Sequence, residues 1–254
     1  MNSKGRVQSI DRAIAVLNCF SLKRQELRLT EIADELDLNK STAHGIITTL
    51  KYHGLIDQDE ESQKYRLGLK LLELGGIVKE SIGIREIAKP YIDEIRSKLE
   101  ETVHLGTLDK KEVVYLEKAE SHQSMRIVTT IGSRMPAYCT GIGKAMLAYV
   151  DEQTVLDLLP DEIERFTPNT ITDKNQLIEE LKKIRDQGYS LDNQEHDLGL
   201  TCVGAPIFDN LGNASYGISV SGPSIRITED RIKEIITIVK DAADKISREL
   251  GYCE

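Results

Sequence analysis

Polar and cationic side chains gather between residues 39 and 53 with types and spacing suited to binding DNA. Serine and threonine hydroxyls can donate to phosphate oxygens, an imidazole or a threonine can reach base edges, and lysine attracts phosphate whatever the base sequence. The candidate contacts are Lys40, Ser41, Thr42, His44, Thr48 and Lys51. The alternative is an ordinary solvated helix surface. We favour DNA contacts because the neighbouring elements are those that present such a helix.

Two short helices are predicted to position these side chains. The first follows Thr30, which we expect to cap it, and the second begins near Ser41 and ends at Gly54, a residue type that favours helix C-termini. Their separation of three or four residues is typical of a helix-turn-helix. An earlier helix over residues 10–20 is expected to bury Ile10, Ile14, Leu17 and Phe20.

A β-hairpin is predicted directly after this pair of helices. Two β-prone runs, residues 55–58 and 64–67, are joined by polar residues and would form the wing of a winged helix. Four cations lie where they could reach backbone phosphates, although each could simply be solvated: Arg6, Arg12, Lys64 and Arg66.

The charge of the chain is unevenly distributed. The net charge is −9, yet residues 1–67 carry ten Lys plus Arg and ten Asp plus Glu, so the acidic excess lies in residues 68–254. A neutral DNA-binding domain has few phosphate contacts and would bind weakly as a single copy. Dimerisation would double the phosphate contacts, so we expect a palindromic operator of double-stranded DNA.

The rest of the chain predicts a linker and a second domain. Residues 69–82 form a helical pattern weakened at Gly75 and Gly76. Mixed helices and strands then follow, with helices at 85–100, 143–150, 152–159, 174–187 and 229–250, and strands at 103–109, 112–120, 124–132, 202–208 and 214–221. We predict an α+β fold with a winged helix-turn-helix domain over 1–68, a linker helix over 69–84 and an α+β domain over 85–254.

Composition excludes several classes of protein. No apolar run is long enough to span a bilayer and the N-terminus lacks the apolar stretch of a signal peptide, so we expect a cytoplasmic protein. The four cysteines are widely spaced, without a CxxC pair, which favours reduced thiols. We expect no cofactor, no metal and no catalytic residues.

The segment from Gly188 to Asp209, GYSLDNQEHDLGLTCVGAPIFD, resembles the signature of the IclR-type bacterial regulators, named for the isocitrate lyase regulator. The resemblance extends to VQSIDRAIAVL, LNKSTAHGIITTL, KYRLGLKLLELG and YCTGIGKAMLA. It implies a DNA-binding transcriptional regulator that has a GAF-like effector-binding C-terminal domain and works as a homodimer or tetramer. Gly45 departs from the family, in which arginine is common at this position, so a guanine contact is not expected there.

The resemblance also implies a site for a small carboxylate, keto acid or sugar acid. By resemblance, the residues of this chain that would contact the ligand are of two kinds. Gly141 and Ile142 would use their backbone amides, and Asp192, Cys202, Ser219 and Ser221 would use their side chains. A helix N-terminus attracts anions, which suits the loop before Lys144. Each residue also has a plain structural explanation, as a core cysteine, a solvated serine or a turn-forming aspartate. Arg126 and Arg134 are alternative partners for a carboxylate.

Other functions are open at this point. An enzyme could use Cys202 as nucleophile and His196 as base, and zinc could be held by His104, Cys139, His196 and Cys202, but neither spacing is diagnostic. A winged helix can also bind proteins, and the C-terminal domain could serve only to form oligomers. The sequence does not distinguish a repressor from an activator.

Overall fold

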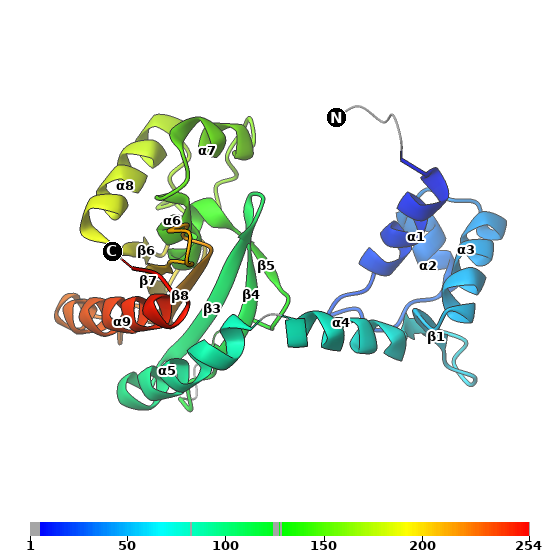
Figure 1. Cartoon of the computed structure of the whole chain (residues 1–254). Helices are drawn as coiled ribbons and strands as arrows, with labels where there is room; N and C mark the ends of the chain where they lie inside the picture. Colours follow the sequence, from blue (N-terminus) through cyan, green and yellow to red (C-terminus); the bar gives the residue numbers. More distant parts are fainter. Residues whose placement is uncertain (1–5, 82, 124–126, 128, 254) are drawn as a thin grey trace. The chain divides into compact units, whose positions relative to one another are not determined.

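The chain folds into two compact units, residues 1–82 and 83–254. The computed structural model in Figure 1 describes residues 6–81, 83–123, 127 and 129–253. Each unit has its own apolar core, and the α+β fold class predicted from the sequence is confirmed.

The first unit is a winged helix-turn-helix followed by a helix. Its elements are α1 (Gln8–Asn18), α2 (Leu29–Glu35), α3 (Lys40–Tyr52), β1 (Ile56–Gln58), β2 (Tyr65–Leu67) and α4 (Leu69–Ser81). The two strands pair antiparallel, and Leu27 adds backbone hydrogen bonds of 2.9 and 2.7 Å to Tyr65. The core joins Val16 of α1 to Ile32 of α2 and Ile47 of α3, so packing among the three helices fixes the orientation of α3.

Two details of this unit differ from the sequence predictions. Thr30 lies inside α2 and is not its cap, because the helix begins at Leu29 and Arg28 is the N-cap residue. The Glu31 carboxylate accepts a hydrogen bond from the Arg28 N–H at 2.7 Å. Ile10 and Ile14 are 60% and 52% exposed rather than buried. Apolar residues cover more than one face of α1, and packing against α3 selects the side that carries Val16.

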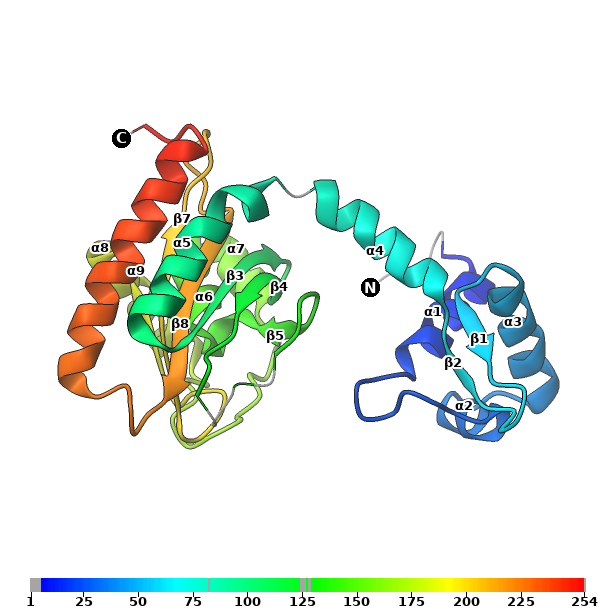
Figure 2. The same cartoon turned by 90° about the horizontal axis from the view of Figure 1, so that it is seen from below.

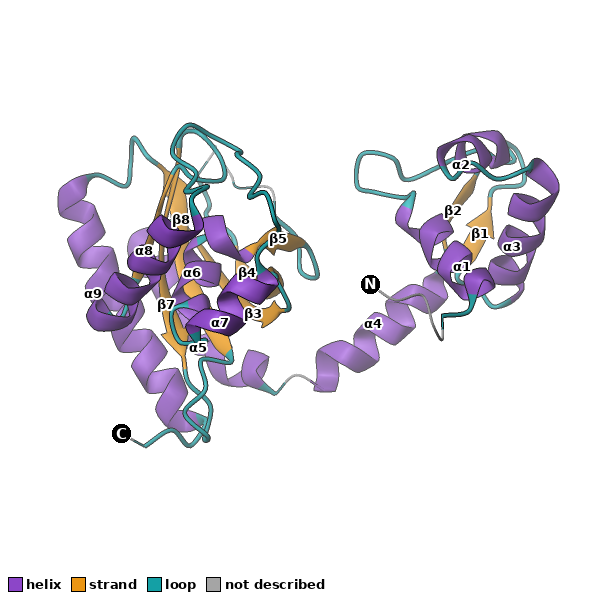
Figure 3. Ribbon diagram, turned by 90° about the horizontal axis from the view of Figure 1, so that it is seen from above, coloured by secondary structure: helices purple, strands orange, loops and turns teal. Residues whose placement is uncertain are grey.

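The second unit is built on a six-stranded antiparallel sheet in the order β5-β4-β3-β8-β7-β6. The strands are β3 (Thr102–Asp109), β4 (Glu112–Ala119), β5 (Arg134–Pro136), β6 (Ser190–Asn193), β7 (Leu200–Ile207) and β8 (Tyr216–Pro223). Two long helices, α5 (Ile84–Leu99) and α9 (Glu229–Glu249), pack on one face of this sheet. The other face is covered by α6 (Gly141–Leu147), with α7 (Glu152–Leu158) and α8 (Lys174–Gln187) outside it (Figures 2 and 3).

Two segments differ from the predicted pattern. The third strand is β5 rather than residues 124–132, of which 124–126 and 128 lie outside the described residues. Asp192 belongs to the edge strand β6, which the sequence did not predict. Helix α4 continues through Gly75 and Gly76 without interruption. In the part of the chain that the structure describes, no helix is both long and apolar enough to cross a membrane.

Candidate functional site

Helix α3 presents an exposed polar face. Four residues separate it from α2, and Asp37 in this connection adopts a left-handed φ of 50°, which turns the chain sharply between the helices. Five of the six predicted contacts are exposed on α3, namely Lys40, Ser41, His44, Thr48 and Lys51, while Thr42 is half-buried. The arrangement is that of a recognition helix, whose N-terminal residues face the major groove.

Some of these side chains already have partners within the chain. The Asn39 side chain caps α3 by accepting hydrogen bonds from the Thr42 N–H at 2.8 Å and from the Ser41 hydroxyl at 2.9 Å. Lys51 Nζ donates to Gln58 Oε1 at 3.1 Å. Lys40, His44 and Thr48 make no side-chain hydrogen bond with any described residue and are therefore ready to bind a ligand without losing one.

The flanking cations lie in exposed ion pairs. Arg6 pairs with Asp11 at 2.8 Å, Arg66 with Asp57 at 2.9 Å and Lys64 with Glu26 at 3.6 Å. Exposed pairs of this kind contribute only about 0–1 kcal/mol, so phosphate can replace the carboxylate at little cost. Arg12 is half-buried and has no ion-pair partner among the described residues.

Gly45 has no packing role in this unit. A Cβ added there would meet nothing within 4 Å, and the residue is exposed on α3. The Thr49 hydroxyl donates to the Gly45 carbonyl at 3.0 Å. The helix would be more stable with alanine at this position, so the glycine has no structural explanation within the chain itself.

The strand register of the second unit gathers the polar residues named from the sequence on one face of the sheet. Asp192 lies opposite Cys202, and Cys202 lies opposite Ser221. Ser219 lies opposite both Gly204 and His104. Directly opposed residues point to the same side of a sheet, so four of the six predicted effector contacts share one surface, which we call the polar sheet face.

The remaining two predicted contacts, Gly141 and Ile142, begin the helix that covers this face. A Cβ on Gly141 would lie 3.3 Å from Cys202 Cβ, and one on Gly204 would lie 2.6 Å from backbone atoms of Gly141. Glycine at both positions therefore allows α6 to approach β7 closely. Thr140 caps the helix by accepting a hydrogen bond from the Gly143 N–H at 3.2 Å.

The polar sheet face is almost completely excluded from solvent. Asp192, Cys202, Ser219 and Ser221 are between 2% and 7% exposed. Burial raises the pKa of Asp192 to about 6 and holds the pKa of the Cys202 thiol well above its usual range. Cys202 lies between Asp192 and Ser221 in the strand register, and interactions with both side chains influence the pKa of its thiol. The face therefore offers hydrogen-bonding groups in a dry environment, with a protonated thiol.

A buried ion pair connects α6 to the segment after β6. The side chains of Lys144 and Glu195 are 1% and 7% exposed and contact each other directly. Lys144 Nζ also donates to the Leu191 carbonyl at 2.6 Å. Sequence reasoning missed this pair, although a lysine within the otherwise apolar stretch GIGKAML was a usable signal.

Two models of known protein families match this chain. The family model described as "Bacterial transcriptional regulator IclR C-terminal" matches residues 77–248, and the one described as "IclR helix-turn-helix domain" matches residues 9–60. This chain belongs to the IclR family of bacterial transcriptional regulators. The resemblance seen in the sequence is confirmed.

Named relatives of this IclR-family protein match over nearly the whole chain. XynR and KdgR of Escherichia coli strain K12 are each 36% identical over 247 residues, which cover 97% of this chain and 98% and 94% of theirs. Both are named as HTH-type transcriptional regulators. The crystal structure of IclR from Thermotoga maritima has a TM-score of 0.78 and 35% identity, covering 97% of this chain and 100% of its own.

The groups considered for catalysis or zinc binding are separated in this IclR-family protein. The His196 ring stacks on Phe166, with centroids 4.6 Å apart, and its Nδ1 lies 2.9 Å from Asp197, while the Cys202 thiol is engaged with Asp192 and Ser221. Among the described residues, no three His, Cys, Asp or Glu side chains are grouped so as to hold a metal ion. The zinc set considered from the sequence is therefore not assembled.

Arg134, one of the two alternative carboxylate partners, is not part of the polar sheet face. Arg134 is on the edge strand β5, where it is 46% exposed and pairs with Asp109 and Glu112. Arg126 lies outside the described residues.

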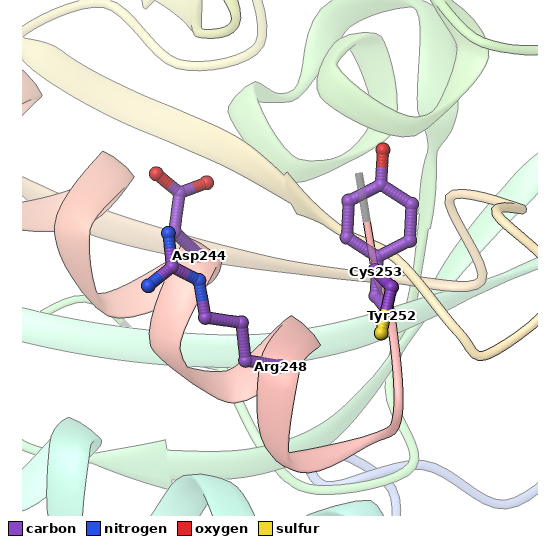
Figure 4. Close-up of a pocket in the computed structure, with 4 residues that line it drawn as sticks. All are labelled: Asp244, Arg248, Tyr252 and Cys253. Carbon is purple, nitrogen blue, oxygen red and sulfur yellow. The ribbon is translucent and has the colours of Figure 1, made fainter.

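A surface cavity at the C-terminal end of α9 is a separate feature. It has a volume of about 300 Å³ and is lined by Asp244, Arg248, Tyr252 and Cys253 (Figure 4). Because α9 packs on the opposite side of the sheet from α6, this cavity does not belong to the polar sheet face.

One buried residue of this face was not predicted as an effector contact. His104 of β3 is 2% exposed, its Nε2 lies 2.7 Å from Thr129 Oγ1, and its ring packs 4.9 Å from that of Tyr115. The sequence suggests His104 only as a candidate zinc ligand. Its place beside Ser219 depends on strand register, which the sequence pattern does not reveal.

Proposed function

We propose that this IclR-family protein is a cytoplasmic regulator whose affinity for its operator changes when a small organic acid binds at the polar sheet face. The observation that carries the proposal is the convergence of Asp192, Cys202, Ser219 and Ser221 beneath the start of α6. Buried polar side chains are costly unless they are satisfied, so a face rich in them under a helix start suits a polar ligand.

The operator contacts proposed are those on α3, its flanks and the wing. They comprise Lys40, Ser41, Thr42, His44, Thr48, Lys51, Arg6, Arg12, Lys64 and Arg66. We assign base contacts to His44 and Thr48, which have no competing hydrogen bond among the described residues, and phosphate contacts to the cations.

An exposed apolar surface on the first unit supports the proposal of self-association. On α1, Ile10 and Ile14 are 60% and 52% exposed, and on α4, Leu69 and Leu72 are 82% and 73% exposed. Monomers rarely leave so many large apolar side chains in water. We therefore propose a homodimer or tetramer on a palindromic operator, whose two half-sites double the phosphate contacts of a neutral domain.

Effector and operator binding are coupled in this proposal by linkage. If the acid binds better to one geometry of the oligomer, operator affinity changes by the reciprocal coupling, typically about 1–3 kcal/mol. We assign this coupling to a linker over residues 69–84, between a DNA-binding domain over 1–68 and an effector domain over 85–254.

A second candidate is a ligand-free regulator whose C-terminal domain mainly forms oligomers. It is favoured by one observation: the Cys202 thiol already interacts with the side chains of both Asp192 and Ser221 within the chain. In that case the polar sheet face would only stabilise the fold.

A thermal-shift screen separates the two candidates. Wild type, S219A and the matched control S97A would be screened with pyruvate, glyoxylate, lactate and D-gluconate. Ser97 lies on α5 and donates to the Asp93 carbonyl at 2.7 Å, at an exposed position. A ligand that binds only the folded state raises its melting temperature. We expect one acid to stabilise wild type and S97A but not S219A, whereas no shift with any acid would support the ligand-free candidate.

A further inference from the structure

His104 carries a buried nitrogen without a partner on the polar sheet face. The residue lies directly opposite Ser219 across the β3–β8 pair, so the two side chains share this face. One ring nitrogen, Nε2, is held by Thr129 Oγ1 at 2.7 Å. The other, Nδ1, is buried and has no hydrogen-bond partner among the described residues.

The ring is held firmly in place. Thr129, its partner, accepts at its own carbonyl a hydrogen bond of 2.9 Å from Lys118 Nζ, and Lys118 also pairs with Glu120 at 2.9 Å. The Tyr115 ring packs against the imidazole. Thr129 and Tyr115 thus restrain the ring, and rotating it to find another partner for Nδ1 would break its bond to Thr129.

The positive charges that the described residues place near this face are already neutralised. Lys144 is paired with Glu195, and Lys118 with Glu120 and with backbone carbonyls. Burial lowers the pKa of His104 to about 3, so its imidazole is neutral. Among the described residues, no unpaired cation is therefore left on this face, and the imidazole Nδ1 and the hydroxyls of Ser219 and Ser221 can bind a ligand only as neutral hydrogen-bonding groups.

We propose that His104 Nδ1 hydrogen-bonds to a hydroxyl group of the effector, so that the site selects hydroxy acids over acids that lack that hydroxyl. This assignment rests on the proposed effector site. A hydroxyl both donates and accepts, so it satisfies Nδ1 in either tautomer of the ring, whereas a carboxylate can only accept. A site built to hydrogen-bond a ligand hydroxyl rejects the analogue without it, because the protein group is then left buried and unpaired.

The test compares acids that differ by one hydroxyl. Binding to wild type, H104Q and H104N would be measured by calorimetry for lactate against propanoate, D-glycerate against lactate, and D-gluconate against its monodeoxy analogues. Glutamine places its amide near the Nε2 position and keeps the bond to Thr129, while asparagine places its amide near the Nδ1 position. The two variants therefore distinguish the contribution of Nε2 to binding from that of Nδ1.

We expect wild type to prefer the hydroxylated member of at least one pair by about tenfold. H104N should keep this preference to within about threefold, and H104Q should lose it. An unchanged preference in H104Q would overturn the assignment while leaving the effector site intact. If none of these acids bound to wild type, the proposed effector site would fail for this class of ligand, and the assignment with it.

A measurement on wild type keeps the assignment testable if H104Q does not fold. In ¹⁵N spectra of histidine-labelled protein, the His104 signals are those missing from H104N. The Nδ1 signal should move when the hydroxylated acid is added and not when its deoxy analogue is added. Equal movement with both acids would overturn the assignment.

Discussion

The ammonium group of Lys144 lies against the carboxylate of Glu195, and both side chains are almost fully excluded from solvent. This contact joins α6, which covers the polar sheet face, to the segment that follows β6. The proposed effector contact Gly141 lies on α6, and Asp192 lies on β6, three residues before Glu195. The pair therefore helps to hold these two contacts together.

Removing one partner of this buried ion pair should strongly lower the stability of the fold. K144M leaves the Glu195 carboxylate buried without a counter-ion and should lower the free energy of unfolding by about 3–5 kcal/mol, measured by urea denaturation. The double variant K144M/E195L should recover most of the loss. The control K245M breaks the exposed Lys245–Asp241 pair of 2.7 Å and should cost less than about 1 kcal/mol. Similar losses in K144M and K245M would contradict the role of burial.

Asp192 should make stability depend on pH. Its folded pKa of about 6 exceeds its ordinary value of 3.8, so the folded state binds the proton more tightly. Asp192 therefore does not lower the free energy of unfolding below about pH 4. It lowers this free energy increasingly as the pH rises to about 6, and by about 3 kcal/mol above that pH. D192N removes the charge and keeps an oxygen to accept from the Glu195 N–H.

The advantage of D192N over wild type should accordingly grow between about pH 4 and about pH 6 and then level off. The measurement is the free energy of unfolding of both proteins across this range. A difference that does not vary with pH would show that Asp192 titrates normally. An anionic effector should also bind wild type less well as the pH rises through about 6, with a weaker trend in D192N.

Substitution of Gly45 should change the stability of the first unit and its DNA binding in opposite directions. G45A should raise the stability of the first unit by about 0.5–1 kcal/mol, because the new methyl group meets nothing within 4 Å. It should also weaken operator binding, since the methyl group would occupy space that the DNA approaches. Thermal denaturation and gel-shift titration measure the two effects. Unchanged operator affinity would show that DNA does not approach Gly45 closely.

Gly75 and Gly76 should influence the response to effector. Both lie inside α4, and a Cβ added at either position would meet nothing within 4 Å, so G75A/G76A should stiffen the helix without steric conflict. We expect operator affinity without effector to change less than about twofold, and the effector-induced change to differ more than that. Gel shifts with and without the acid give both quantities. An unaltered effector response would remove α4 from the coupling.

Lys40 should contribute to DNA affinity mainly by contacting phosphate. K40A should weaken operator and non-specific DNA alike, and should reduce the slope of log affinity against log salt by about one for each protomer bound. K245A on α9 is the control and should leave the slope unchanged. A loss confined to the operator sequence would instead indicate a base contact.

Local patterns in the sequence determined much of the architecture. Helix α8 was predicted at its observed bounds, Lys174–Gln187, because its apolar spacing and its cap are encoded within a few residues. The helix-turn-helix was recognisable for the same reason. The family followed from the motif around Gly188–Asp209, and the family models confirm it.

The tertiary structure decided what local patterns leave open. Which apolar residues of α1 are buried depends on where α3 packs, so Val16 is buried and Ile10 is exposed. Asp192, Cys202, Ser219 and His104 come from separate strands of the chain, and only strand register places them on one face. Register is set by long-range pairing and by the close approach of α6 at Gly141 and Gly204, neither of which is visible in residue spacing.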